Sequence, residues 1–218
     1  MIVVLDMDEC LLHSQFYSPE HDYRQHEEGR PDNADGSPAA SSKSSSVETF
    51  DLTLPDGDVV VVHKRPDLDA FLASVSSKYE THVFTAAMEV YASPVLDVLD
   101  PRGSMLSGRW YRDSCSYDES YQAYAKDLRT IVGSPSSDAL RRVVLVDNNP
   151  MSFLTQPSNG ILVSNFYDDP TDKTLRAVTE LLDELDGEED VRNLLRGRFG
   201  IEDALRDMQG TGRKRNDR

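Results

Sequence analysis

The chain opens with Met1-Ile2-Val3-Val4-Leu5-Asp6-Met7-Asp8-Glu9-Cys10, and this stretch decides the fold. Its apolar run contains two adjacent valines, which is typical of a short strand buried on both faces inside a parallel sheet. The run ends abruptly in acidic residues. Asp6 and Asp8 stand two apart, so in an extended backbone both side chains leave the same side of the chain.

The carboxyl ends of strands are where α/β sheets keep their sites. Two carboxylates at such an end suit a bound cation, a nucleophile and a general acid/base. A hard cation such as Mg²⁺ takes oxygen ligands and neutralises an incoming phosphate. The structural alternative is that the acidic residues cap the helix that follows a strand, and the Asp-x-Asp pattern alone does not decide between the two.

Length and charge set the broad class of the protein. The 218 residues suffice for one large domain, or for one domain with an embellishment. The 39 acidic and 23 basic side chains give a formal net charge of −16, which argues against direct binding to nucleic acid. Any phosphate site must therefore rely on local cations and a metal ion, helped by screening beyond a Debye length of about 8 Å at physiological salt.

Two absences in the sequence bear on location. No apolar run approaches the roughly 20 residues that span a bilayer, and no signal peptide is recognisable, so we expect an intracellular protein that does not enter a membrane. The two cysteines, Cys10 and Cys115, cannot form a disulfide framework or a cysteine-based zinc site, which fits a reducing compartment.

Residues 17–48 differ in composition from the rest of the chain. They contain Ser41-Ser42-Lys43-Ser44-Ser45-Ser46 and almost no aliphatic side chains, so they cannot bury enough surface to offset their ordering entropy. We predict a disordered, serine-rich surface loop. Beyond it, alternating hydropathy over 50–54, a turn composition over 55–58 and four valines over 59–62 predict a hairpin.

Buried strands then alternate with helices, which predicts an α/β fold with a doubly wound parallel sheet. A helix is expected to open at Lys64-Arg65-Pro66, and the helix over 91–99 is expected to be broken in two by Pro94. The aromatic, aperiodic stretch 101–124 is predicted to be an insertion beside the sheet, and 197–218 a C-terminal tail. Further strands are expected at 81–85, 143–146 and 161–163, and further helices at 175–185 and 191–195.

Residues with chemically useful side chains recur at or near strand ends or just before helices: Asp6 with Asp8, Thr85, Lys126, and Asp147 with Asn148. Phosphoryl transfer to a carboxylate needs such a set, because one carboxylate attacks, another moves a proton, a hydroxyl and an ammonium hold the phosphate, and an acid/amide pair completes a Mg²⁺ shell. Each of these residues, considered alone, also has an interpretation that involves no chemistry. Thr85 could cap a helix, Lys126 could be a solvated charge, and 147–150 could be a turn.

The order of these pieces resembles the haloacid dehalogenase superfamily and, at closer range, the phosphatases of the RNA polymerase II C-terminal domain, in particular the small ones. The resemblance implies one phosphatase domain over 1–196, with a doubly wound core and a small β insertion between the second and third motifs, which suits 101–124. The matching pieces are Val4-Leu5-Asp6-Met7-Asp8-Glu9-Cys10-Leu11-Leu12-His13-Ser14, Lys64-Arg65-Pro66, Phe84-Thr85-Ala86, Tyr91-Ala92, Tyr111-Arg112-Asp113-Ser114-Cys115, Lys126-Asp127-Leu128, Val146-Asp147-Asn148-Asn149-Pro150 and Asp190-Val191-Arg192.

The resemblance also implies Mg²⁺-dependent removal of phosphate from serine or threonine in proteins, on the polymerase C-terminal domain or a similar phosphoserine-proline substrate. Matched motif by motif, Asp6 is the expected nucleophile that becomes aspartyl phosphate, and Asp8 the expected acid/base. Thr85 and Lys126 match the phosphate-holding pair. The expected metal ligands are Asp6, the Asp8 carbonyl and Asn148, with Asp147 supporting the shell.

Family members hold the peptide in an apolar pocket, whose expected positions are Phe16, Leu52, Leu54, Val60 and Met88, with Tyr91 and Arg112 at its edge. The chain departs from the family at Cys10, where the motif carries threonine. A thiol is a poorer hydrogen-bond partner than a hydroxyl, so we expect lower activity rather than its loss.

Two other interpretations stay open. One is a protein-binding subunit without phosphatase chemistry, as in mitochondrial import, although the intact Asp6-x-Asp8 and the lack of a basic presequence speak against it. The other is a phosphatase of dullard type, which acts on a lipid-metabolism enzyme at the nuclear envelope. Members of that type carry a membrane-anchoring N-terminus, whereas this sequence opens with the first strand. We expect a monomer that acts on a phosphorylated protein, in the nucleus rather than the cytoplasm.

Overall fold

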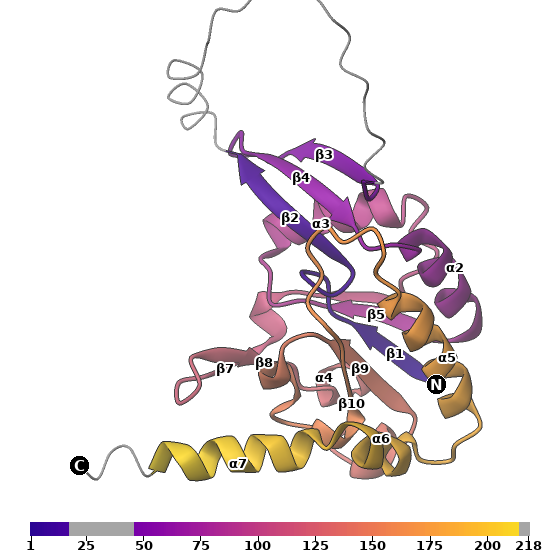
Figure 1. The fold of residues 1–218 in the computed structure, drawn as a ribbon, viewed down its shortest axis with the longest axis vertical. Helices are drawn as coiled ribbons and strands as arrows, with labels where there is room; N and C mark the ends of the chain where they lie inside the picture. The colour runs from indigo at the N-terminus through magenta and orange to yellow at the C-terminus, as the bar shows by residue number, and fades with distance from the viewer. Residues whose placement is uncertain (18–45, 214–218) are drawn as a thin grey trace, which may run out of the picture.

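The computed structural model describes residues 1–17 and 46–213, and a five-stranded parallel sheet lies at its centre (Figure 1). The strand order is β10-β9-β1-β5-β6, and every neighbouring pair is parallel. This confirms the predicted α/β class with β1 in the middle of the sheet. The strands are β1 (Ile2–Leu5), β5 (Glu80–Phe84), β6 (Gly108–Trp110), β9 (Val143–Asp147) and β10 (Gly160–Leu162).

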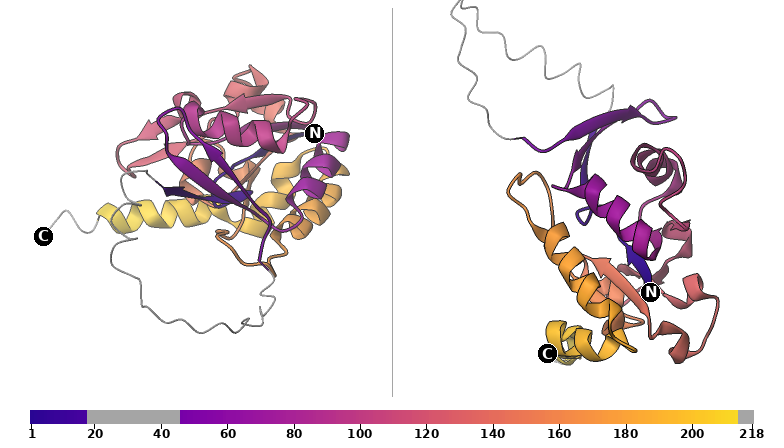
Figure 2. Two further views of the ribbon diagram at one scale, coloured as in Figure 1. Left: turned by 90° about the horizontal axis from the view of Figure 1, so that it is seen from above. Right: turned by 90° about the vertical axis from the view of Figure 1, so that its right-hand side faces the viewer.

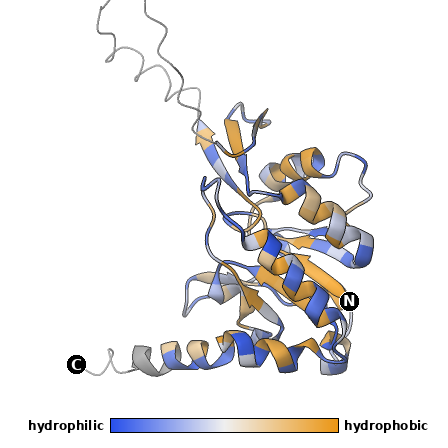
Figure 3. Ribbon diagram, turned by 45° about the vertical axis from the view of Figure 1, so that its right-hand side comes forward, coloured by the Kyte–Doolittle hydropathy of each residue, from blue (hydrophilic) through white to orange (hydrophobic). Residues whose placement is uncertain are grey.

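The sheet is covered on both faces, as the apolar N-terminal run requires. Val3 and Leu5 of β1 belong to one buried cluster, together with the apolar faces of the helices α2, α3 and α5, whereas Val4 belongs to a second cluster with Phe153 and Ile201. Figure 3 shows hydrophobic residues concentrated on the strands of the main sheet and alternating with hydrophilic ones along the helices. The covering helices are α2 (Leu68–Lys78), α3 (Glu89–Leu99), α4 (Arg129–Val132), α5 (Thr174–Asp186), α6 (Val191–Phe199) and α7 (Ile201–Arg213).

A second, antiparallel sheet of order β2-β4-β3 lies above the carboxyl ends of the main strands (Figure 1). The predicted hairpin is confirmed as β3 (Thr49–Thr53) and β4 (Val59–Lys64). The third strand of this sheet, β2 (Leu12–Tyr17), pairs with β4 and was not expected from the sequence. The polar residues His13, Ser14 and Gln15 give β2 too little apolar alternation to reveal it.

Two predictions about the helices need correction. Helix α2 begins at Leu68, after Pro66, so the Lys64-Arg65-Pro66 run precedes the helix. Helix α3 is continuous through Pro94 rather than broken in two. Pro94 removes one backbone hydrogen bond in the second turn, while the buried side chains of Tyr91, Val95 and Leu99 hold the helix on the core.

The stretch 101–124 does not form one insertion beside the sheet. Its first strand, β6, is the edge strand of the main sheet, whereas β7 (Ser116–Asp118) and β8 (Ala123–Ala125) form a separate hairpin. The predicted domain end at residue 196 falls inside α6, and Ile201 and Leu205 of α7 are buried against the second cluster. Packed structure therefore continues into the segment predicted as a tail.

The predicted disordered loop over 17–48 lies mostly outside the described residues, but both of its ends are ordered. Tyr17 is the last residue of β2, and Val47 is buried. Glu48 accepts hydrogen bonds from Lys64 through its backbone and its side chain. Figure 2 shows the two described ends meeting the antiparallel sheet. In the described part of the chain, no helix has both the length and the apolar character needed to cross a membrane.

Candidate active site

A cleft of about 690 Å³ lies where the carboxyl ends of β1, β5 and β9 face the antiparallel sheet. Parallel strands bring their ends to one edge, so residues far apart in sequence meet there. All the residues predicted to act in chemistry or metal binding line this cleft: Asp6, Asp8, Thr85, Lys126, Asp147 and Asn148.

Lys126 lies between two carboxylates at the floor of the cleft. Its Nζ donates to Asp6 Oδ1 and, over 2.6 Å, to Asp147 Oδ2. The exposed fraction is 2% for Lys126 and 1% for Asp147, so the alternative of a solvated surface lysine is wrong. Burial, followed by repulsion from Asp147, raises the pKa of Asp6, while Lys126 opposes both. When both carboxylates are ionised, the cluster of two carboxylates and one ammonium carries one net negative charge, which a bound cation would offset.

Backbone hydrogen bonds hold Asp6 and Lys126 in place. The Asp6 amide donates to the Val146 carbonyl over 2.9 Å, which ties the end of β1 to β9. Lys126 follows β8, and its amide donates to the Ser152 carbonyl over 3.1 Å. The cluster is thus preorganised by segments that the fold brings together.

Asp8 is held by a tyrosine. The Tyr91 hydroxyl donates to Asp8 Oδ1 over 2.5 Å, and the Ser14 hydroxyl lies 2.5 Å from the same phenol oxygen. Burial raises the pKa of Asp8 to about 6, and the Tyr91 hydrogen bond opposes the rise. A carboxyl group with that pKa is partly protonated near neutral pH, as a general acid must be.

Thr85 and Arg112 present donors to the cleft. Thr85 is 1% exposed, and its Oγ1 accepts from the Ala87 amide over 3.0 Å, which leaves the hydroxyl proton free to donate. It does not cap α3, whose N-cap is Met88. Arg112 donates from Nε to the Ala86 carbonyl over 2.6 Å and stacks over Tyr124 at 5.4 Å, with its guanidinium at the cleft.

Three oxygens from the predicted metal ligands converge on one side of Asp6. The side-chain oxygen of Asn148 lies 3.1 Å from Asp6 Oδ2 and 3.3 Å from the Asp8 carbonyl oxygen. Either the amide turns its nitrogen toward these two acceptors, or a cation lies among the three oxygens. Carboxylate, carbonyl and amide oxygens are the donors that Mg²⁺ prefers, so this set fits the ion. No cluster of three or more His, Cys, Asp or Glu side chains suited to a metal occurs among the described residues.

The predicted peptide pocket is only partly formed by the expected residues. Phe16 and Met88 are more than half exposed, and both line the cleft with Leu54, Tyr91 and Arg112. Val60 is a wrong prediction, because its side chain is fully buried in the core cluster. Leu52 also does not line the cleft. It lies opposite Val60 in the strand register and packs on the same core.

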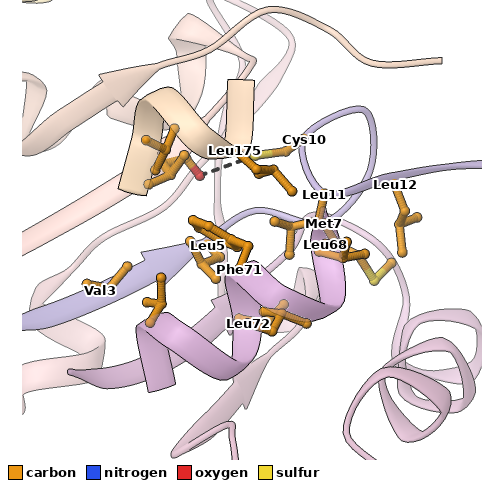
Figure 4. Close-up of a cluster of buried hydrophobic side chains, with 14 of the residues drawn as sticks. Val3, Leu5, Met7, Cys10, Leu11, Leu12, Leu68, Phe71, Leu72 and Leu175 are labelled. Carbon is orange, nitrogen blue, oxygen red and sulfur yellow. Dashed lines mark hydrogen bonds between the residues drawn. The ribbon is translucent and has the colours of Figure 1, made fainter. Parts of the chain in front are cut away.

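Cys10 lies beneath the cleft rather than in it. It is fully buried among apolar side chains, and its thiol donates to the Val146 carbonyl over 3.8 Å, the dashed line in Figure 4. The same carbonyl accepts from the Asp6 amide. Burial raises the pKa of the Cys10 thiol well above its usual range. Both cysteines are free thiols.

The sequence offered no reason to include Ser14, Arg65 or Asn165 among the candidate site residues. Ser14 lies two residues before Phe16 in β2, so a prediction of that strand would have placed both on one face. Arg65 is 1% exposed and contacts Cys10, and Asn165 contacts Asn148. The partners of these two residues are distant in sequence, so no local pattern points to them.

Comparison with known proteins identifies the family of the chain. The family model described as "NLI interacting factor-like phosphatase" matches residues 1–192. The chain belongs to this phosphatase family. Two of the similar proteins are CTD nuclear envelope phosphatase 1B of Danio rerio, 36% identical over 89% of this chain and 70% of the relative, and nuclear envelope morphology protein 1 of Saccharomyces cerevisiae, 33% identical over 91% of this chain and 42% of the relative.

A solved structure shares the fold. The RNA polymerase II CTD phosphatase Fcp1 is 20% identical with a TM-score of 0.51, and the match covers 88% of this chain and 51% of that protein. The chain therefore spans about half the length of Fcp1 and about 70% of the zebrafish relative. The comparisons confirm the predicted family and the enzyme class, which is protein phosphatase.

Proposed function

We propose that this protein is a Mg²⁺-dependent phosphatase of phosphoserine and phosphothreonine in proteins, acting through an aspartyl phosphate on Asp6. The observation that carries the proposal is the buried cluster in which Lys126 bridges Asp6 and Asp147 at the floor of an open cleft. Asp6 Oδ2 faces Asn148, which leaves Oδ1, beside Lys126, as the attacking oxygen. Attack forms an oxygen–phosphorus bond at Asp6 and releases the serine or threonine oxygen.

Asp8 is the group that moves protons. In its acid form it donates a proton to the leaving oxygen, and as a carboxylate it then takes a proton from the water that hydrolyses the aspartyl phosphate. A pKa of about 6 allows both forms near neutral pH. Tyr91 and Ser14 hold the Asp8 carboxyl in one orientation.

Thr85 and Lys126 would hold the phosphate oxygens, because a free hydroxyl proton and an ammonium group face the same cleft. Asp6, the Asp8 carbonyl and Asn148 would hold Mg²⁺, with Asp147 keeping Lys126 and the backbone amide of Asn149 in place. The bound ion would supply positive charge that keeps Asp6 ionised and offsets the phosphate charge. Local cations thereby overcome the acidic net charge of the chain.

The substrate is proposed to be a phosphorylated protein segment that lies along the apolar wall formed by Phe16, Leu54 and Met88, with Arg112 at the edge of the cleft. One candidate is the RNA polymerase II C-terminal domain or a similar phosphoserine-proline sequence, supported by the fold shared with Fcp1. A regulator at the nuclear envelope is the other, supported by the names of the zebrafish and yeast relatives. With either substrate, the proposed site of action is in or at the nucleus.

The test is a phosphopeptide array assayed with Mg²⁺ and with EDTA, using wild type, Asp6→Asn and a matched control. The control, Asp183→Asn, makes the same chemical change on α5, where Asp183 is 51% exposed. We expect wild type and the control to release phosphate only with Mg²⁺, and Asp6→Asn to release none. Phosphate release by Asp6→Asn at the wild-type rate would contradict the proposal, and peptide binding without release would indicate a binding module instead.

A further inference from the structure

We propose that Asn165 and Tyr167 form a hydrogen-bond relay that directs the side-chain oxygen of Asn148 toward the Mg²⁺ site. Asn148 donates from Nδ2 to Asn165 Oδ1 over 3.1 Å, and Asn165 in turn donates from Nδ2 to the Tyr167 hydroxyl oxygen over 3.1 Å. Both residues lie in the segment after β10 and are positioning residues in this relay. The inference rests on the proposed function and deepens it.

The relay matters because the amide of Asn148 has two ends and only one of them can hold a cation. With its nitrogen toward Asn165, Asn148 presents its oxygen to Asp6 Oδ2 and to the Asp8 carbonyl, at 3.1 and 3.3 Å. If Asn148 alone turned over, two oxygens would face each other across the Asn148–Asn165 contact. A turn of Asn148 therefore requires Asn165 to turn as well, with Tyr167 becoming the donor.

The backbone fixes the segment that carries the relay. The Val163 amide donates to the Asp147 carbonyl over 3.0 Å, and the Phe166 amide donates to the Glu9 carbonyl over 2.8 Å. Phe166 is 1% exposed, so Asn165 is anchored on its C-terminal side by a buried side chain. The two anchors tie the segment to the last residue of β9 and to the loop after β1, next to the proposed metal ligands.

The far end of the relay is also held. The Tyr167 ring packs edge-on against His13 at 5.1 Å, and His13 Nδ1 lies 3.1 Å from Glu9 Oε1. The Tyr167 hydroxyl is thus kept within reach of Asn165. Supporting residues of this kind commonly orient metal ligands and change metal affinity when they are removed.

The test is a titration of the full chain with Mg²⁺, measured by isothermal titration calorimetry. This measurement reports metal binding and does not depend on activity. We expect Asn165→Ala to weaken Mg²⁺ binding by about 3- to 10-fold, the effect of one lost orienting hydrogen bond. Tyr167→Phe keeps the ring against His13 and should weaken binding less. Because Tyr167 acts through Asn165, the double variant should bind no more weakly than Asn165→Ala alone.

Two further variants separate orientation from general damage. Asn165→Asp keeps an acceptor for Asn148 and should bind Mg²⁺ at least as tightly as wild type. Asn193→Ala, on α6, makes the same change away from the cleft and should leave binding unchanged. Without Mg²⁺, the thermal midpoint of Asn165→Ala should stay within about 2 °C of wild type, since a surface side chain is removed.

The outcomes distinguish this inference from the proposed function. If wild type binds Mg²⁺ and Asn165→Ala binds it equally well, the relay is overturned and the proposed function stands. Fully additive losses in the double variant, or weaker binding by Asn165→Asp, would also overturn the relay. If wild type binds no Mg²⁺, the relay and the proposed metal dependence are overturned together.

Discussion

Arg65 and Lys126 are two of the cations buried in the described part of the chain, and their surroundings differ. Arg65 is 1% exposed and donates to the Cys10 carbonyl over 2.8 Å, to both carboxylate oxygens of Asp172 over 2.7 and 2.9 Å, and to the hydroxyls of Ser164 and Thr174. It also lies 5.5 Å above the Phe166 ring. Lys126 has two carboxylate partners and an open cleft above it.

This difference separates a cation that stabilises the fold, Arg65, from one that lines the proposed active site, Lys126. The Arg65 guanidinium pairs with one carboxylate and joins four segments, so its charge and geometry are matched within the fold. Lys126 is outnumbered by Asp6 and Asp147, and this imbalance leaves a site where a further cation is favourable. The fold therefore stabilises the first cluster by itself, whereas the second leaves room for the Mg²⁺ ion and the phosphate that the proposed function requires.

The largest expected effect is on Asp6. Asp6→Asn keeps the shape of the side chain but removes the attacking carboxylate, so turnover should fall on the order of 10⁴-fold or more, as for other catalytic nucleophiles. Phosphate release from a phosphopeptide in single-turnover assays measures this, and circular dichroism checks the fold. A loss below tenfold would show that the carboxylate of Asp6 is not the nucleophile.

The second-largest loss of activity is expected for Lys126→Met. Removing one preorganised charge from a phosphate site typically costs ~3 kcal/mol of transition-state stabilisation, so we expect kcat to fall about 10²-fold or more. The methionine fills the same volume, which limits packing damage. Steady-state kinetics measures the loss, and a decrease under threefold would mean that Lys126 serves the fold, like Arg65, rather than the reaction.

Arg65→Met should instead lower stability. It leaves Asp172 without its partner and removes the donor from the Cys10 carbonyl, and breaking a buried pair from one side costs about 3–5 kcal/mol. Urea unfolding measures the change. The double variant Arg65→Met with Asp172→Asn should lose less than the sum of the single variants, and full additivity would contradict the pairing.

The Arg65–Asp172 pair should also make the free energy of unfolding depend on pH in the acid range. Burial alone would raise the pKa of Asp172, but Arg65 and the Thr174 amide hold it below its ordinary value of 3.8. A lowered folded-state pKa contributes stability that is complete above 3.8 and is lost as the pH falls below it. Urea unfolding of wild type and Asp172→Asn between about pH 6 and pH 3 should show a steeper acid loss in wild type. Parallel profiles would contradict the assignment.

The smallest effect is expected at Cys10. Its thiol and the Asp6 amide share the Val146 carbonyl, so Cys10→Thr would replace a weak sulfur donor with a hydroxyl near the nucleophile. One hydrogen bond is worth ~0.5–1.5 kcal/mol, which corresponds to a rise in kcat of about 2- to 10-fold with little change in KM. Unchanged kcat in reductant would show that the pocket is already adapted to cysteine.

The sequence predicted the site better than its surroundings, for a physical reason. Asp6, Asp8 and Asp147 stand at the ends of apolar strands, so their meeting follows from a parallel sheet. Helix α7 was missed because only Ile201, Leu205 and Met208 mark its apolar face among charged residues.

The residues that line the proposed peptide pocket could be predicted only in part. The sequence does not show which face of a strand packs on the core and which face is open to the cleft. Val60 was assigned to the pocket, yet it lies with Val62 on the face of β4 that packs on the core cluster. Side chains on a strand alternate between the two faces of the sheet, and which face packs on the core depends on how the sheet lies on the rest of the fold. The Arg65–Asp172 pair spans 107 residues, a separation that no local pattern reports.

The most direct test of the covalent mechanism is mass spectrometry of enzyme quenched in acid during turnover of a phosphopeptide. The expected result is a phosphate adduct on the peptide that contains Asp6, which disappears with hydroxylamine and is absent from Asp6→Asn. Sustained Mg²⁺-dependent turnover with no adduct on Asp6, or with the adduct on another residue, would contradict the account.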